Sequence, residues 1–100
     1  MIEKQIIKLM LNKDFYAEYK GQVSRNVFQG SFGSLYDTIQ KAHEKYDANI
    51  SLDELYSLHT AVFNPALTRA AKEQFSELLE DIKETQEPSK EIADDIIKIL

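Results

Sequence analysis

The sequence contains no cysteine and no tryptophan, and it has only three glycines and two prolines among 100 residues. Without cysteine, the chain forms no disulfide framework and no cysteine-ligated zinc site, which fits a reducing, cytoplasmic setting. No apolar run approaches the roughly 18 residues that a membrane-spanning helix needs, so we do not expect this chain to be an integral membrane protein. The first residues carry too many charges for a secretory signal peptide.

Motifs typical of catalytic, metal-binding or phosphate-binding sites are also absent from the sequence. The only histidines, His43 and His59, have no neighbours at metal-ligand spacing, so we expect hydrogen-bonded structural roles for both. Asp94 and Asp95 are adjacent, and adjacent residues of a helix point about 100° apart, so they do not share a proton as catalytic pairs do. Gly30–Gly33 forms a GxxG segment without the Lys-Ser/Thr of a phosphate-binding loop. We therefore expect no catalytic, metal or cofactor site and no enzyme activity in this chain.

The charge is acidic and unevenly distributed. The formal net charge is −5, with residues 1–50 carrying +1 and residues 51–100 carrying −6. An acidic surface repels phosphate, so we expect no direct binding to nucleic acid. The acidic half is either an ordinary solvated helix surface or a face for a basic protein partner.

Apolar residues recur every three or four positions along most of the chain, which is typical of amphipathic helices. No stretch alternates apolar and polar residues for long enough to predict a strand. The pattern predicts an all-α fold, a compact bundle of about five or six helices. The first expected helix begins near residue 2. The other five are expected at residues 14–20, 31–46, 51–63, 65–85 and 89–100.

Small polar residues and proline mark where these helices begin. Ser51 followed by Glu54 has the spacing of a capping box, in which each side chain bonds the backbone N–H of the other residue. The other predicted starts are Asp14, Ser31 or Ser34, Pro65, and Ser89 after the break at Glu87-Pro88.

The last predicted helix is still strongly apolar where the sequence stops. Its residues Ile96, Ile97, Ile99 and Leu100 predict a face that meets a partner or further chain. We therefore expect residues 1–86 to form a helical head domain, and residues 87–100 to begin a linker or hairpin helix that has been truncated.

An ordered series of apolar, aromatic and capping residues runs through the first four predicted helices. It consists of Leu9-Met10-Leu11-Asn12, Tyr16, Tyr19, Val23, Phe28, Leu35-Tyr36, Ile39, Ser51 and Leu55. This series resembles the N-terminal domain of DnaB-type replicative helicases, especially those of tailed phages. The resemblance covers residues 5–60 and extends over 61–100 only in helix lengths. Bacterial members usually have Asp at the position of Ser51 and a small-residue pair at Ile7-Lys8, which indicates a divergent phage version.

The resemblance implies a role without chemistry. In that family this domain is an all-helical head that leads into a helical hairpin, and heads and hairpins assemble as a collar on a hexameric motor. It implies self-association as a dimer or hexamer, contact with primase or a helicase loader, and a place in the host-cell cytoplasm. ATP and Mg²⁺ would bind only in a separate motor domain. The candidate residues for partner contact are Ile96, Ile99 and Leu100, followed by Tyr16 and Tyr19.

Two other functions fit the same residues. The helicase-binding domain of a primase is a related helical fold, although it lies at a C-terminus. A free-standing small acidic phage protein could imitate such a domain as an adaptor.

Overall fold

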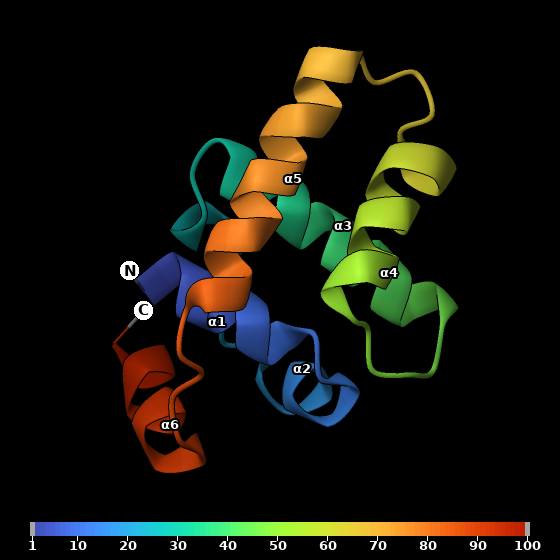
Figure 1. The fold of residues 1–100 in the computed structure, drawn as a ribbon. Coiled ribbons are helices and arrows are strands. Elements are labelled where there is room, and N and C mark those ends of the chain that lie inside the picture. Colours follow the sequence, from blue (N-terminus) through green and yellow to red (C-terminus); the bar gives the residue numbers. More distant parts are fainter. Residues whose placement is uncertain (1, 100) are drawn as a thin grey trace.

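The computed structural model describes residues 2–99 and confirms the all-α bundle (Figure 1). Over this range the chain forms six α-helices, a 3₁₀ turn and a π-helical turn, with no strand. The α-helices are α1 (Ile2–Met10), α2 (Lys13–Tyr19), α3 (Ser31–Lys45), α4 (Leu52–Ser57), α5 (Arg69–Glu84) and α6 (Lys90–Lys98). The 3₁₀ turn is η1 (Arg25–Val27), and the π-helical turn is η2 (Leu58–Phe63).

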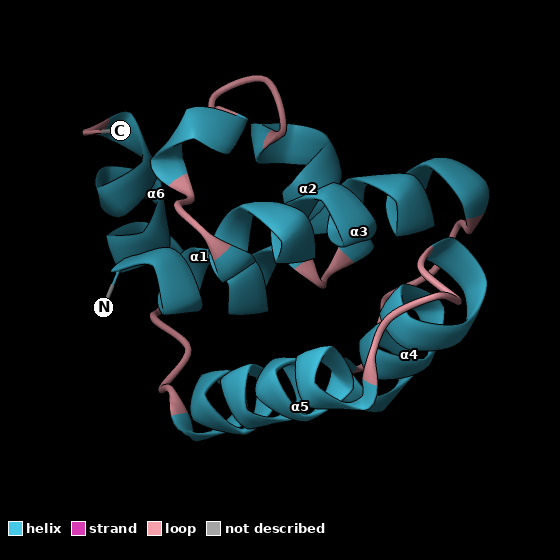
Figure 2. Cartoon of the chain, turned by 90° about the horizontal axis from the view of Figure 1, so that it is seen from above, coloured by secondary structure: helices cyan, strands magenta, loops and turns pink. Residues whose placement is uncertain are grey.

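The long helix α5 lies along one side of the bundle, and α1 and α3 lie on the other (Figure 2). Helix α4 contacts α5 and η2 contacts α3, so together they close the bundle at one end. Helix α6 lies at the opposite end (Figures 1 and 2) and contacts α2 through the hydrogen bond between Tyr19 and Asp94. Lys8 of α1 ties that end together, since its Nζ donates to the carbonyl oxygens of Lys83 and Thr85 at 3.2 and 2.7 Å.

The core is a single cluster of apolar side chains to which every α-helix contributes. Tyr36 of α3 is fully buried, and its ring stacks on Phe28 with the ring centroids 4.5 Å apart. Burial of each large apolar side chain contributes about 1.5–3 kcal/mol, so this cluster is the main stabilising feature of the fold. The largest fully buried side chains are Tyr36, Ile6, Ile7, Met10, Leu35, Ile39, Leu55, Ile82 and Ile97.

Two of the predicted helix starts are confirmed. Ser51 and Glu54 form the capping box at the start of α4, with bonds of 2.9 and 3.1 Å. Ser89 caps α6, because its hydroxyl accepts a hydrogen bond from the backbone N–H of Ile92. In both cases a hydroxyl satisfies an N–H that the helix leaves without a partner.

Helices α1 and α3 begin at Ile2 and Ser31, as expected, but three of the predicted capping or first residues are wrong. Asn12 caps α2 in place of Asp14, since its Oδ1 accepts from the N–H groups of Asp14 and Phe15 at 3.0 Å each. Gly30 occupies the N-cap position of α3 in place of a capping Ser31 or Ser34, and it has a φ of 57° and ψ of −128° that residues with side chains disfavour. Helix α5 begins after Thr68 rather than at Pro65, because the Thr68 hydroxyl accepts from the N–H of Ala71.

The predicted helix over residues 51–63 changes its winding midway. Helix α4 ends at Ser57, and η2 continues it with wider turns. The wider winding is visible where the Asn64 N–H donates to the carbonyl of His59, five residues earlier, at 3.1 Å. It turns His59 and Thr60 toward the core.

No helix within residues 2–99 is long and apolar enough to cross a membrane. Helix α6 contributes Ala93 and Ile97 to the buried residues of the bundle. The domain boundary expected after residue 86 stays a prediction.

Candidate interaction surface

Helix α6 presents one apolar side to the bundle and another to solvent. Ser89 sets its start, and Ala93 and Ile97 point inward, where Ile97 is 2% exposed. Positions 93 and 97 are four residues apart, so they lie on the same side of the helix. The buried pair therefore determines which residues face outward.

Polar contacts fix this rotation of α6. The Tyr19 hydroxyl on α2 donates to Oδ1 of Asp94 at 2.8 Å, and Lys98 lies 2.9 Å from the other oxygen of the same carboxylate. Lys90 pairs with Glu18 at 3.7 Å. Hydrogen bonds from Lys98 and Tyr19 lower the pKa of Asp94. The bond between Tyr19 and Asp94 also raises the pKa of Tyr19 to about 12. Asp94 is thus held ionised between its two donors.

Three isoleucines form a stripe along one side of α6. Ile92 is 56% exposed and Ile99 is 75% exposed, whereas Ile96 between them is half-buried and packs against the core cluster. Their spacing of four and then three residues places them on one face of the helix. We call Ile92, Ile96 and Ile99 the α6 stripe. Adjacent exposed apolar side chains of this kind mark an interaction surface when they form a continuous patch.

The predicted partner-contact residues fall into three groups. Ile96 and Ile99 lie on the α6 stripe, and Leu100 lies outside the described residues. Tyr16 and Tyr19 lie in the core, 8% and 4% exposed, so they offer a partner almost no surface. The ring of Tyr16 stacks on His43 with ring centroids 4.4 Å apart, which explains its burial.

The sequence prediction did not include Ile92 among the candidate contact residues, although Ile92 lies on the predicted apolar face and is exposed. The available signal was its spacing of four residues before Ile96 and seven before Ile99. The prediction gave weight to the last residues of the chain instead.

Both histidines have the structural roles expected from the sequence. Nε2 of His43 donates to the carbonyl of Met10 at 2.6 Å. Nδ1 of His59 lies 2.7 Å from the hydroxyl of Thr38, and its ring stacks on Phe75 with centroids 3.9 Å apart. Burial, followed by the nearby charge of Lys41, lowers the pKa of His59. His59 therefore joins α3, η2 and α5 as a neutral ring.

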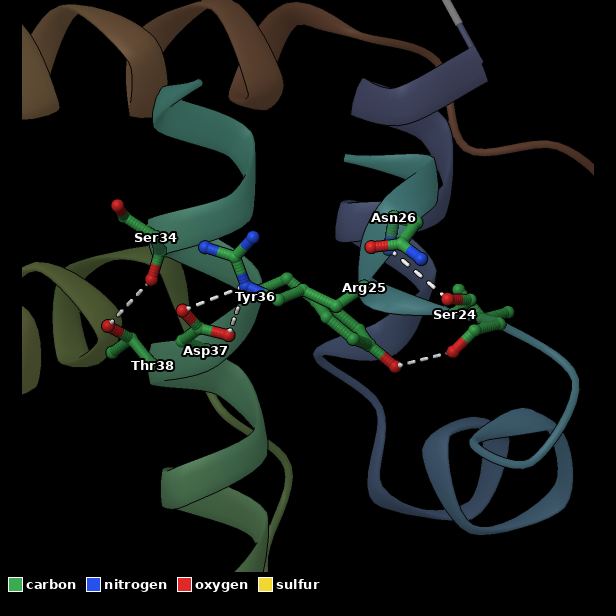
Figure 3. A network of polar contacts seen from close by, with 8 residues as sticks. Ser24, Arg25, Asn26, Ser34, Tyr36, Asp37 and Thr38 are labelled. Atoms are coloured by element: carbon green, nitrogen blue, oxygen red, sulfur yellow. Dashed lines mark hydrogen bonds and ion pairs between the residues drawn. The ribbon is translucent and has the colours of Figure 1, made fainter. Parts of the chain in front are cut away.

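The GxxG segment begins α3 and lies against an ion pair (Figure 3). Nε of Arg25 lies 3.0 and 3.1 Å from the two carboxylate oxygens of Asp37. A Cβ added at Gly33 would lie 3.0 Å from Nη2 of Arg25, so the glycine leaves room for the guanidinium. Within residues 2–99, no three His, Asp or Glu side chains gather closely enough to hold a metal ion.

Comparison with known proteins adds no relative. The chain matches no family model, no curated protein and no solved structure. The likeness to DnaB-type helicases rests on the ordered residue series alone.

Proposed function

We propose that this chain is the non-catalytic N-terminal collar domain of a phage replicative helicase of the DnaB type, acting in DNA replication in the host cytoplasm. Two features support the proposal. One is the residue series from Leu9 to Leu55, in which Asn12 and Ser51 act as helix caps. The other is an all-helical bundle with an outward apolar helix near its end.

The observation that carries the proposal is the α6 stripe. Each square ångström of apolar surface removed from water contributes about 25 cal/mol, so contact over this stripe favours association. In the collar, the stripe meets a second copy or the following hairpin, and assembly sets the symmetry of the ring. Primase or a loader then binds the assembled collar, while ATP and Mg²⁺ belong to the motor domain.

The first test is the intact mass of the native gene product, together with its sequence beyond residue 100. Several hundred further residues that contain G-x-x-x-x-G-K-[ST] would support the proposal, because this motif binds the phosphates of ATP in the motor. A product that ends at Leu100 would contradict it and favour the free adaptor. If the gene product is instead a primase that carries the Leu9–Leu55 residue series in its C-terminal domain, the result would favour the helicase-binding domain of a primase.

The second test addresses self-association through α6. Sedimentation velocity over a concentration series compares the wild type with Ile99→Asp and with the matched control Val62→Asp, which alters another exposed apolar residue, on η2. We expect Ile99→Asp to weaken association and Val62→Asp to leave it unchanged. A wild type that stays monomeric, or an unchanged Ile99→Asp profile, would remove the stripe from the interface.

A further inference from the structure

A second surface, far from α6, is formed where the loop after α3 meets α4. A groove of about 430 Å³ opens there. Binding pockets in proteins commonly measure about 300–1,000 Å³, so this groove has room for side chains of a partner. It is lined by Tyr46, Ala48, Asn49, Ile50, Asp53, Glu54, Ser57 and Leu58.

The floor of the groove is apolar. Ile50 is buried and Leu58 is half-buried, so both present carbon surface that belongs to the edge of the core. Tyr46 at one wall is 39% exposed. An exposed aromatic ring beside an apolar floor is a typical anchor point in protein interfaces.

The walls of the groove are held in place without a ligand. Oδ1 of Asn49 accepts from the backbone N–H of Lys13 at 2.9 Å, and the N–H of Ile50 donates to the carbonyl of Leu11 at 2.9 Å. The opposite wall begins at the capping box of Ser51 and Glu54. A preformed groove binds with little loss of conformational entropy.

The charged residues that line the groove, Asp53 and Glu54, are both acidic and exposed. A basic group also lies beside the groove, since the ammonium of Lys45 is 5.6 Å from the centroid of the Tyr46 ring. Hydrogen bonds from the backbone and hydroxyl of Ser51 lower the pKa of Glu54, so this carboxylate is ionised at neutral pH. The groove on the other side of α4 differs, because Lys83 lines it together with Glu80.

We propose that the groove between residues 46–50 and α4 binds a basic amphipathic segment of a protein partner. An apolar side chain of the segment packs between Tyr46 and Leu58, and its lysine or arginine residues face Asp53 and Glu54. The α6 stripe of a second copy is bordered by exposed Glu91 and Asp95 as well as by exposed Lys90 and Lys98. It is therefore not the uniformly basic surface that complements Asp53 and Glu54.

This inference is independent of the proposed function, because it involves the loop after α3 and α4 rather than the α6 stripe. A failure of either proposal leaves the other standing.

The probe is a fluorescent amphipathic peptide made of leucine and lysine at helical spacing, with a twin in which glutamate replaces lysine. Fluorescence anisotropy measures affinity, and ¹H–¹⁵N spectra locate the contact. We expect the lysine peptide to bind and to shift the signals of Ile50, Ser57 and Leu58, while the glutamate twin does not bind.

Matched variants test the two parts of the groove separately. Asp53→Lys should weaken binding of the lysine peptide about tenfold or more, and Asp53→Asn should weaken it less. The control Asp95→Lys makes the same charge change on α6 and should alter affinity by less than about twofold. Tyr46→Ala should also weaken binding about tenfold, in contrast to Ile92→Ala on the α6 stripe. Circular dichroism verifies that each variant remains folded.

Three results would overturn the proposal. The first is a set of shifted signals that lies on α6 and not around the groove. The second is an equal loss of affinity for Asp53→Lys and Asp95→Lys, which would indicate general charge attraction. The third is a dimer of the chain that Asp53→Lys or Tyr46→Ala disrupts, which would assign the groove to a second copy.

Discussion

The hydroxyl of Tyr19 donates a hydrogen bond of 2.8 Å to Oδ1 of Asp94, a residue 75 positions later in the chain. The bond joins α2 to α6 and lies beside the Lys98 contact to the same carboxylate. It orients α6 so that Ala93 and Ile97 face the bundle while Ile92 and Ile99 remain outside.

Removing this hydroxyl should loosen α6 selectively. In Tyr19→Phe the ring still fills its place in the core, but Asp94 loses a donor. We expect backbone amides of α6 to exchange with solvent about three- to tenfold faster, while those of α3 are unchanged. Hydrogen exchange measured by NMR tests this, with Tyr46→Phe as the control at an exposed tyrosine. Equal exchange in α6 of Tyr19→Phe and wild type would show that the bond does not hold the helix.

Two isoleucines on opposite sides of α6 should differ in their effect on stability. Ile97→Ala removes a buried side chain and should lower the free energy of unfolding by about 2–5 kcal/mol. Ile99→Ala changes a side chain that is 75% exposed, and its effect should stay within about 0.5 kcal/mol. Urea denaturation of the two variants measures the difference. Similar losses would mean that α6 is rotated from its position in the structure.

His59 should make stability depend on pH. Burial lowers its pKa from the usual 6.5, so between the two values the unfolded chain binds more protons than the native chain. The free energy of unfolding should therefore rise with pH across this window and fall as the pH drops below about 6.5. Urea titrations from about pH 5 to pH 8 should show this slope in the wild type and a smaller slope in His59→Gln. An identical slope in both proteins would assign the pH dependence to other groups.

The backbone at Gly30 should tolerate no side chain. Its φ of 57° and ψ of −128° lie in a region that L-residues avoid, so Gly30→Ala should cost about 1–3 kcal/mol of stability. Gly21 has no such φ and no atom near the place of a Cβ, so Gly21→Ala should be neutral or stabilising by up to about 1 kcal/mol. Thermal unfolding of both variants tests the contrast. Equal midpoints would show that Gly30 adopts another conformation in solution.

Periodicity was sufficient to predict the helices, because each amphipathic stretch has an apolar face that only a packed bundle buries. The capping box at Ser51 was predictable as well, since both of its bonds are local. The start of α2 was not, because Asn12 and Asp14 are both good caps and the choice depends on where α1 ends. The start of α5 at Thr68 likewise depends on how the chain leaves η2.

The surface was harder to predict than the core. Spacing indicated that Tyr19 and Ile96 lie on apolar faces, but not that Tyr19 would be covered by a helix 75 residues later in the chain. The wider winding of η2 was also hidden, because it accompanies the packing of His59 against Thr38 and Phe75, which lie far from His59 in the sequence. The groove beside Tyr46 is formed by a loop whose anchors, Leu11 and Lys13, lie in a different part of the sequence.

The burial of Ile6, Ile7, Ile82 and Ile97 in one cluster has a consequence for synthesis on the ribosome. The first two are made roughly 90 residues before the last, which at about 5–20 residues per second is a delay of roughly 5–18 seconds. Until α3 and α5 are made, α1 lacks the helices that cover it, and its apolar face is open to chaperones or to neighbouring nascent chains. Synonymous codons that slow translation between α1 and α5 should therefore reduce the yield of folded protein without any change in the finished molecule.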